Sequence, residues 1–301
     1  MVRLIKDVGE IGLLGRIKSK IKLSRDVVAG IGDDAAVLKY GRKYHMLFTT
    51  DSLIENIHFK LKGIKPEQIG RKAVEINVSD IAAMGGFPKY MLVSLSMPRN
   101  TDVSFVDKLY KGINEAAKKY KISIVGGNLS RSKQINVHIS LIGFVEKNLL
   151  CLRSNAKVGD IICVTGKLGK KARKEHIVRN YLEPKAQLAQ GRILSRFVNA
   201  MQDVSDGLGS DLRAICRQSK VGAIIYKSKF SKSKNFDRWY MHVDYLELIF
   251  TIPKNKLNKL KKTNVKFSVI GEIKNKKEGI FMIDKNKKYK LKQGYDHFRS
   301  L

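Results

Sequence analysis

The sequence predicts an α/β or α+β protein of two domains. Short apolar, strand-like runs alternate with longer helix-like segments in both halves of the chain. A chain of 301 residues, 43% of them hydrophobic, is long enough to build two domains with cores of their own. The polar, turn-like residues 151–160 separate the halves, so we expect domains at residues 1–150 and 151–301.

The first half predicts strands and helices in regular alternation. Helix 66–85 has Pro66 in its first turn and is stopped by the pair Gly85–Gly86. Residues 90–97 predict a strand, and 104–120 predict an amphipathic helix. The other expected elements are a strand at 45–50 that ends at Asp51, a strand that leads into a glycine turn at 121–128, and a strand at 135–145.

The second half begins with a predicted strand at 161–166. Residues 203–219 then predict a loop that enters a helix. Further strands are expected at 221–226 and 265–271, on either side of a Lys-rich region. This order again favours a mixed α/β domain.

The composition indicates a globular protein with a large excess of positive charge. The formal net charge is +32, from 59 Lys and Arg against 27 Asp and Glu. Nucleic-acid-binding proteins need a basic surface, but here the lysines are spread along the chain with few aromatic residues among them. We therefore favour a solvated basic surface over a nucleic-acid interface.

The cysteines and the N-terminal residues predict a cytoplasmic protein. Cys151, Cys163 and Cys216 are scattered without CxxC spacing, which favours a reducing compartment over disulfides or a zinc site. Residues 1–22 mix charges with apolar side chains, so we expect no signal peptide. No apolar run approaches the roughly 18 residues of a membrane span.

Most of the acids in predicted turns share one setting, at the end of an apolar run beside Gly, Ser, Thr or Asn. They are Asp33 and Asp34 in the segment GIGDDAAVL, Asp51, Asp80, Asp203 and Asp206. Carboxylates among hydroxyls and glycines are the hard oxygen ligands that Mg²⁺ prefers, usually shared with substrate phosphates. Helix caps and Asx turns also explain any single one of them, so both interpretations stand on residue types alone.

Motifs of several other enzyme classes are missing from the sequence. It contains no GxxxxGK[ST] loop, no protein-kinase set of HRD and DFG motifs, no GxSxG and no HExxH. The segment GGNLSRS at 126–132 offers a glycine pair that can cradle an anion through its backbone. Phosphate and metal chemistry therefore has no strong competitor among these motifs.

At the same acidic segments the sequence resembles the thiamine-monophosphate kinase family, in the aminoimidazole ribonucleotide synthetase-like superfamily. The matching segments follow the family's order: GIGDDAAVL, TTDSLIENIHF, IGRKAVEINVSDIAAMGG, IVGGN, LRSNAKVGD, VTGKLG, DVSDGL and GYDHF. The resemblance implies that superfamily's two-domain fold, whose N-terminal sheet forms a barrel with that of a second subunit across a homodimer. It also implies direct transfer of a phosphoryl group from ATP to thiamine monophosphate, with several Mg²⁺ ions and without a phosphoenzyme.

The resemblance further implies roles for single residues. Those at metal positions are Asp34, Thr49, Thr50, Asp51, Asp80, Asn128, Asp203 and Asp206, with Asp33 as a further candidate. Those at ATP positions are Tyr110, Gly127, Asn128, Arg153 and Ser205. Those at acceptor positions are His58, Asp244 and Tyr295. An inventory of many carboxylates and no nucleophile suits a reaction in which the protein positions two polyanions and neutralises their charge.

The chain departs from the family's pattern at three places. The family has Asp where this chain has Asn128, which offers a carbonyl oxygen but no charge. The family's GGEDYELLF appears as MHVDYLELIF at 241–250, so the acceptor-side acid is Asp244 or Glu247, of which we favour Asp244. The chain after VTGKLG is shorter than in the family. The acceptor side is therefore less well matched than the nucleotide side.

Two alternatives remain at this stage. One is a related ATP-dependent enzyme of the superfamily that acts on a different small phosphorylated or carboxamide acceptor. The other is a nucleic-acid-binding derivative that uses the charge of +32. The acids argue against the second alternative, because a binding module for nucleic acid has no use for metal-site carboxylates.

Overall fold

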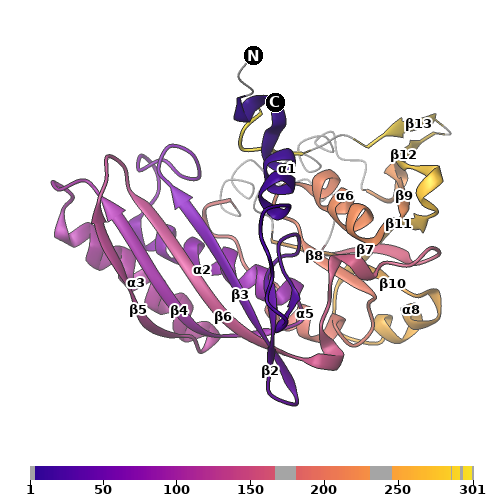
Figure 1. The fold of residues 1–301 in the computed structure, drawn as a ribbon, viewed down its shortest axis with the longest axis horizontal. Coiled ribbons are helices and arrows are strands. Elements are labelled where there is room, and N and C mark those ends of the chain that lie inside the picture. The colour runs from indigo at the N-terminus through magenta and orange to yellow at the C-terminus, as the bar shows by residue number, and fades with distance from the viewer. Residues whose placement is uncertain (1–3, 167–180, 231–245, 286, 292–293, 300–301) are drawn as a thin grey trace.

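The protein contains two open β-sheets that lie side by side, each packed against helices (Figure 1). The structure is a computed structural model that describes residues 4–166, 181–230, 246–285, 287–291 and 294–299. Helix α1 (Ile5–Lys18) stands in front of the junction between the two sheets in this view. None of the described helices is long and apolar enough to cross a membrane.

The first sheet has six described strands in the order β1-β2-β3-β6-β4-β5. Their bounds are β1 Val27–Ala29, β2 Ala36–Tyr40, β3 Tyr44–Ile54, β4 Phe87–Met97, β5 Ser123–Arg131 and β6 Asn136–Glu146. Neighbouring strands are antiparallel, except for the parallel pair of β4 and β5. Within one chain this sheet ends at β1 and β5, so it does not close on itself.

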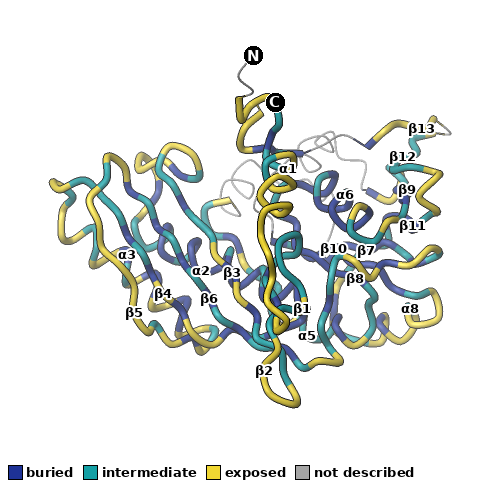
Figure 2. The backbone as a smooth tube through the Cα atoms, viewed as in Figure 1, coloured by how far each residue is buried: buried dark blue, intermediate teal, exposed yellow. Residues whose placement is uncertain are grey.

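Helices α2 (Pro66–Ala83) and α3 (Val103–Tyr120) cover one face of the first sheet. Alternate residues of the strands, such as Val93 of β4 and Ile139 of β6, are buried under these helices because side chains of a strand alternate between its faces. The opposite face carries Phe48, Tyr90 and Leu92, which are 45%, 40% and 46% exposed. Figure 2 shows the exposed course of β5 at the end of this sheet.

The second sheet has seven described strands in the order β13-β12-β9-β11-β7-β10-β8. Their bounds are β7 Ile161–Thr165, β8 Ala200–Asp203, β9 Gly222–Tyr226, β10 Leu248–Ile252, β11 Phe267–Lys274, β12 Ile280–Asp284 and β13 Lys287–Lys290. The described helices of this half are α5 Leu188–Leu194, α6 Leu208–Ser219 and α8 Lys254–Lys261. The described 3₁₀ helices are η1 Lys147–Leu149, at the end of the first half, and η2 Arg153–Asn155, η3 Lys227–Lys229 and η4 Lys276–Glu278 in the second. Leu212 of α6 and Leu260 of α8 belong to two separate cores of this half.

Most expected elements are confirmed within a few residues, but the glycine turn at 121–128 is wrong. The glycine pair lies inside β5, which continues to Arg131. A Cβ atom at Gly127 would lie 1.8 Å from the carbonyl oxygen of Val93 on β4. The glycine therefore allows a close approach of two strand backbones rather than a reversal of the chain. The segment after VTGKLG, where this chain is shorter than the family, begins within residues 167–180, which lie outside the described residues.

Glycines also allow α2 and α3 to pack closely. A Cβ atom at Gly112 of α3 would lie 2.0 Å from the carbonyl oxygen of Glu67 on α2. A Cβ atom at Gly70 of α2 would lie 2.2 Å from the carbonyl oxygen of Leu109 on α3. The separation of the two helices, and with it the position of α2, therefore depends on these two glycines.

We expect Gly112→Ala to lower the free energy of unfolding by about 1–3 kcal/mol, because the added methyl group pushes α3 away from α2. The matched control is Gly15→Ala in α1, where a Cβ atom meets nothing within 4 Å. The control should leave the stability unchanged or raise it by up to about 1 kcal/mol, since alanine is the better helix former. Urea unfolding of both variants decides the point, and wild-type stability of Gly112→Ala would contradict the close packing.

Candidate active site

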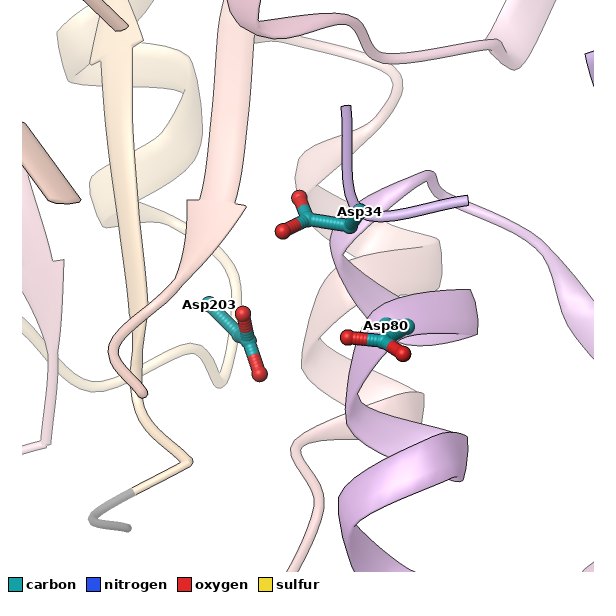
Figure 3. A group of neighbouring side chains, drawn as sticks. All are labelled: Asp34, Asp80 and Asp203. Atoms are coloured by element: carbon teal, nitrogen blue, oxygen red, sulfur yellow. The ribbon is translucent and has the colours of Figure 1, made fainter. Parts of the chain in front are cut away.

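Three aspartates from separate elements converge where the two sheets meet (Figure 3). Asp34 lies in the loop before β2, Asp80 lies on α2, and Asp203 is the last residue of β8. One carboxylate oxygen of each lies within 4.8 Å of the corresponding oxygens of the other two. Three residues that are far apart in the sequence thus form one acidic cluster, called the aspartate triad below.

Hydroxyl groups hold two members of the aspartate triad in place. The Thr49 hydroxyl donates to Oδ2 of Asp80 at 2.5 Å, and the Ser79 hydroxyl donates to Oδ2 of Asp203 at 2.6 Å. Ser79 comes from the first half of the chain and Asp203 from the second, so this buried hydrogen bond joins the two halves. These hydrogen bonds orient the two carboxylates and lower their pKa values, although burial and like charge have the larger, opposite effect.

Burial and like charge act together on the aspartate triad. Burial, and then the charges of Asp51, Asp203 and Asp34, raise the pKa of Asp80 well above its ordinary value. Burial and the charge of Asp34 do the same to the pKa of Asp203. Oδ2 of Asp34 is buried and has no hydrogen-bond partner among the described residues. Such a site stabilises a cation strongly, since a divalent ion would relieve both the repulsion and the unmet oxygen.

Arg153 supplies the positive charge beside the triad. Its guanidinium forms an ion pair with Asp34, and its Nε lies 3.8 Å from Oδ1 of Asp33. Burial disfavours the charge of Arg153, but attraction to Asp34 and Asp33 outweighs this and raises its pKa. Burial and the charge of Asp34 raise the pKa of Asp33 to about 7.

The Asp33 carboxylate, unlike that of Asp34, also accepts hydrogen bonds from backbone amides. The donors are the backbone amides of Arg153 and Asp34, each at 3.1 Å. Asp33 therefore holds the backbone around the triad in place, whereas the carboxylate of Asp34 belongs to the triad itself.

A cavity of about 380 Å³ adjoins the triad. Seven of the residues predicted from the sequence line it: Asp51, His58, Asp80, Asp203, Ser205, Asp206 and Tyr295. The backbone amide of Ile54 donates to Nδ1 of His58 at 3.0 Å, so the proton of a neutral imidazole lies on Nε2. The structure thus brings four of the predicted acids and two of the predicted acceptor residues to one cavity.

Thr50 lies beside this cavity rather than in the triad. It lines a neighbouring cavity of about 660 Å³ that shares Asp51 and His58 with the first. Its hydroxyl donates to the carbonyl oxygen of Ile139 at 3.0 Å. Thr49 and Thr50 point to opposite faces of β3, as neighbours in a strand must.

Gly127 lies on β5, away from the triad. In the paired strands Asp51 lies beside Ile139, Ile139 beside Val93, and Val93 beside Gly127. Three strand spacings of about 4.8 Å place Gly127 about 14 Å from Asp51 across the sheet.

Asn128 and Tyr110 also lie apart from the triad. Asn128 belongs to the row of Ser52 and Ser94, whose side chains point to the face that α2 and α3 leave open. Tyr110 lies on α3, partly buried against the first core. One chain therefore does not bring these predicted ATP and metal residues to the acidic cluster.

The two candidate acceptor acids differ in what the structure describes. Asp244 lies outside the described residues. The carboxylate of Glu247 accepts a hydrogen bond from the Thr165 hydroxyl, and burial raises its pKa. Leu246, in the left-handed backbone region at φ 48°, lines the cavity, whereas Glu247 does not.

Sequence reasoning missed Tyr181 and did not single out His297. The Tyr181 hydroxyl donates to the carbonyl oxygen of His58 at 2.7 Å, and its ring lies 3.8 Å from Nζ of the buried Lys72. His297 lies between His58 and Tyr295, with ring centroids 5.4 and 4.9 Å away. The terminal segment GYDHF contained the signal for His297, but nothing in the sequence around Tyr181 marked it.

Comparisons with known proteins show the family to which the chain belongs. The "AIR synthase related protein, N-terminal domain" family matches residues 32–145, and its C-terminal counterpart matches residues 157–284. A thiamine-monophosphate kinase of Buchnera aphidicola is 35% identical over 90% of this chain and 93% of its own length. The chain belongs to the thiamine-monophosphate kinase family. The kinase of Bacillus subtilis is 32% identical over 96% of this chain and 99% of its own length.

A solved thiamine-monophosphate kinase structure has the same fold. It is described as "AaThiL complexed with AMPPCP and TMP", with a TM-score of 0.85, 31% sequence identity and 99% coverage of both chains. The expected two-domain α/β fold of the aminoimidazole ribonucleotide synthetase-like superfamily is thereby confirmed. In this chain, the aspartate triad and its adjoining cavity form the candidate active site.

The raised pKa of Asp33 predicts a pH-dependent stability of the metal-free protein. A carboxyl group whose pKa is raised from 3.8 to about 7 binds its proton more tightly in the folded state, so its contribution to stability is lost as the pH rises through about 7. In EDTA, the free energy of unfolding of Asp33→Asn relative to wild type should rise by up to a few kcal/mol between about pH 4 and 7, and should then level off. Asp107→Asn, on the exposed side of α3, is the control. Urea unfolding at several pH values measures the difference, and a flat difference would contradict the shift.

Asp80→Asn should abolish activity without unfolding the protein. The change removes one oxygen charge from the triad but keeps the volume, so we expect kcat/KM to fall by about 10²-fold or more. The stability of the metal-free variant should stay at wild-type level or rise, because the substitution removes the burial cost of the Asp80 charge and its repulsion by Asp51, Asp203 and Asp34. Turnover within a few-fold of wild type would show that Asp80 is only a structural residue.

Proposed function

We propose that the protein transfers the terminal phosphoryl group of ATP to thiamine monophosphate, which gives ADP and thiamine diphosphate. The observation that carries this proposal is the aspartate triad beside a cavity, in a chain similar over 99% of its length to a kinase complexed with AMPPCP and TMP. The step belongs to the biosynthesis of thiamine diphosphate.

The residues of the triad fit Mg²⁺. They offer hard oxygen ligands, and the buried, unpartnered Oδ2 of Asp34 points to a missing ligand. Asp34, Asp80 and Asp203 would hold the first ion, and Asp51, Asp206 and the two threonines at 49 and 50 would complete further sites. Bound Mg²⁺ would neutralise the phosphate oxygens and the developing charge of the transition state.

The side chains of the protein mainly bind and orient the two polyanions. Arg153, which pairs with Asp34, would bind a phosphate oxygen if a metal ion neutralised Asp34. Ser205 follows β8 and faces the same cavity, where it can donate to the nucleotide. The attacking oxygen of a phosphate monoester is already an anion near neutral pH, so little general-base help is needed. These roles support the direct transfer without a phosphoenzyme that the resemblance to the family implies.

The acceptor is proposed to lie against His58 and Tyr295. These residues line the cavity together with Tyr181 and His297, which gives the thiamine rings a wall of aromatic and imidazole groups. We keep Asp244 as the acceptor-side acid. The Thr165 hydroxyl already engages the buried Glu247, which supports this choice.

We further propose that two chains form a homodimer in which the open faces of their first sheets close a barrel. The exposed Phe48, Tyr90 and Leu92 lie on that face, and β5 is an unpaired edge in one chain. Such a dimer also accounts for Asn128 and Gly127, because one chain leaves them across the sheet from its own triad. Gly127 and Asn128 would then complete the ATP site, whereas Tyr110 lies on α3, on the covered face of the sheet, and is not explained by this interface.

The proposed domains remain residues 1–150 and 151–301. The two family matches support this division, because one ends at residue 145 and the other begins at residue 157. The ion pair of Arg153 with Asp34 then lies just at the junction of the domains.

The function is tested with purified protein, ATP, Mg²⁺ and thiamine monophosphate, with thiamine diphosphate measured by chromatography. We expect product only when all three are present. A panel of other phosphate monoesters and carboxamides, assayed for ADP release, is the comparison. Release of ADP with another acceptor but not with thiamine monophosphate would overturn the assignment in favour of a different superfamily enzyme.

His58→Asn should raise the KM for thiamine monophosphate by about tenfold or more and leave the KM for ATP nearly unchanged. The imidazole lines the cavity, and the loss of one well-placed hydrogen bond to a charged ligand costs about 1.5–3 kcal/mol. Steady-state kinetics with each substrate varied separately give the two constants. An equal rise of both, or a loss of stability alone, would show that His58 only supports the fold.

Leu92→Asp should shift the protein from dimer to monomer and strongly reduce activity, since it places a charge on the proposed barrel interface. Val103→Asp, on an exposed residue at the start of α3, is the control and should leave the dimer intact. Sedimentation equilibrium at micromolar concentration measures both. An active wild-type monomer would contradict the proposed dimer.

A further inference from the structure

A second cavity with strongly basic walls lies in the C-terminal half and is separate from the cavities beside the aspartate triad. It measures about 490 Å³ and is formed by α6, η4, β12 and β13, with Ile11 of α1 at its rim. None of its lining residues lines either of the cavities beside the triad. Its walls therefore belong to no part of the site described above.

The charge of this basic cavity is one-sided. Its cationic lining residues are Arg213, Arg217, Lys220, Lys276 and Lys290, and no Asp or Glu lines it. No ion pair involves any of these five side chains within the described ranges of the chain. Like charges gathered around a hollow repel one another and raise the local concentration of anions.

Two observations separate this cavity from a merely solvated basic surface. Nε of Arg213 is buried and has no hydrogen-bond partner among the described residues, while its other end donates to the carbonyl oxygen of Leu291. Partial burial and repulsion from Arg153 lower the pKa of Arg217. Without a ligand, Arg213 therefore has a buried donor with no acceptor, and the charge of Arg217 is disfavoured. A bound anion would accept a hydrogen bond from Arg213 and stabilise the charge of Arg217.

Apart from Ser210, the remaining wall of the cavity is mainly apolar. Val221, Ile280 and Phe281 form it, and Nζ of Lys288 lies 4.0 Å from the centre of the Phe281 ring. A simple inorganic ion has no use for such a wall, whereas a flat ring attached to a phosphate gains contact with it. A volume of about 490 Å³ is in the range of small-molecule sites, which is too confined for a duplex nucleic acid.

We propose that the basic cavity binds a small ligand that joins an oligophosphate group to a flat ring, as a nucleoside diphosphate does. The phosphates would lie against Arg213, Arg217 and Lys276, and the ring against Phe281. This site is separate from the proposed kinase reaction and does not depend on it.

The basic cavity is connected to the active-site loop through α6. The Ser219 hydroxyl donates to the carbonyl oxygen of Arg153 at 2.6 Å. The side-chain amide of Gln218 donates to the carbonyl oxygen of Gly32 at 3.0 Å. Both donors follow Arg217 directly in the chain. A ligand that orders the end of α6 would therefore act on the loop that carries Asp33 and Asp34 through the hydrogen bond to Gly32, and on Arg153 through the hydrogen bond from Ser219.

Isothermal titration calorimetry in EDTA tests the site, because without metal ions the acidic triad repels polyphosphates. The probes are pyrophosphate and ADP. We expect one ADP to bind per chain without metal ions. ADP should bind several-fold more tightly than pyrophosphate. Arg217→Gln with Lys276→Gln should weaken both probes by about tenfold or more, as expected for lost charge-assisted hydrogen bonds.

The matched control removes the same charge elsewhere, with Lys256→Gln and Lys259→Gln on the exposed side of α8. It should leave both affinities within about twofold. Phe281→Ala should weaken ADP but not pyrophosphate, so that retained pyrophosphate binding shows a folded cavity.

Three results would overturn the proposal. The first is no binding of either probe in EDTA, and the second is an equal loss in the control variant, which would indicate diffuse attraction to the surface. The third is binding of a short single-stranded RNA that depends on Arg217 and Lys276 while neither small probe binds. The outcome is independent of the kinase assay, since no step needs thiamine monophosphate or Mg²⁺.

Discussion

The repulsion among buried carboxylates is the constraint on which the rest of the structure depends. Asp34, Asp80 and Asp203 come from a loop, a helix and a strand of different sheets, and each has a pKa raised by burial. Two buried hydroxyl donors and the guanidinium of Arg153 offset part of this repulsion. The arrangement stays unfavourable by itself, which is a common property of sites built to receive a cation and a polyanion.

The fold holds these acids at the junction through close helix packing. Gly70 and Gly112 let α2 lie directly against α3, and α2 carries both Ser79 and Asp80. The hydrogen bond from Ser79 to Asp203 then joins α2 to β8 of the second sheet. A small shift of α2 would thus separate the two carboxylates as well as break a bond between the halves. The geometry of the site therefore depends on the packing of the first domain.

Much of this was predictable from local sequence signals. Pro66 and Gly85 marked the ends of α2, and the acids at the ends of apolar runs indicated the triad. The glycine pair of β5 was misread as a turn, because a sequence does not reveal that Val93 approaches Gly127 so closely. Tyr181 escaped notice because its role depends on His58, 123 positions away, and on no pattern around it. The basic cavity is likewise a product of tertiary structure, since its arginines and lysines come from separate elements.

The central claim is that the triad binds divalent metal ions between the protein and nucleotide phosphates. The most direct measurement is a crystal structure with Mn²⁺ and a non-hydrolysable ATP analogue, with the metal located by anomalous scattering. The account predicts anomalous peaks at about 2.2 Å from carboxylate oxygens of Asp34, Asp80 and Asp203, bridged to phosphate oxygens. A nucleotide bound without metal at the triad, or metal bound only elsewhere, would contradict it.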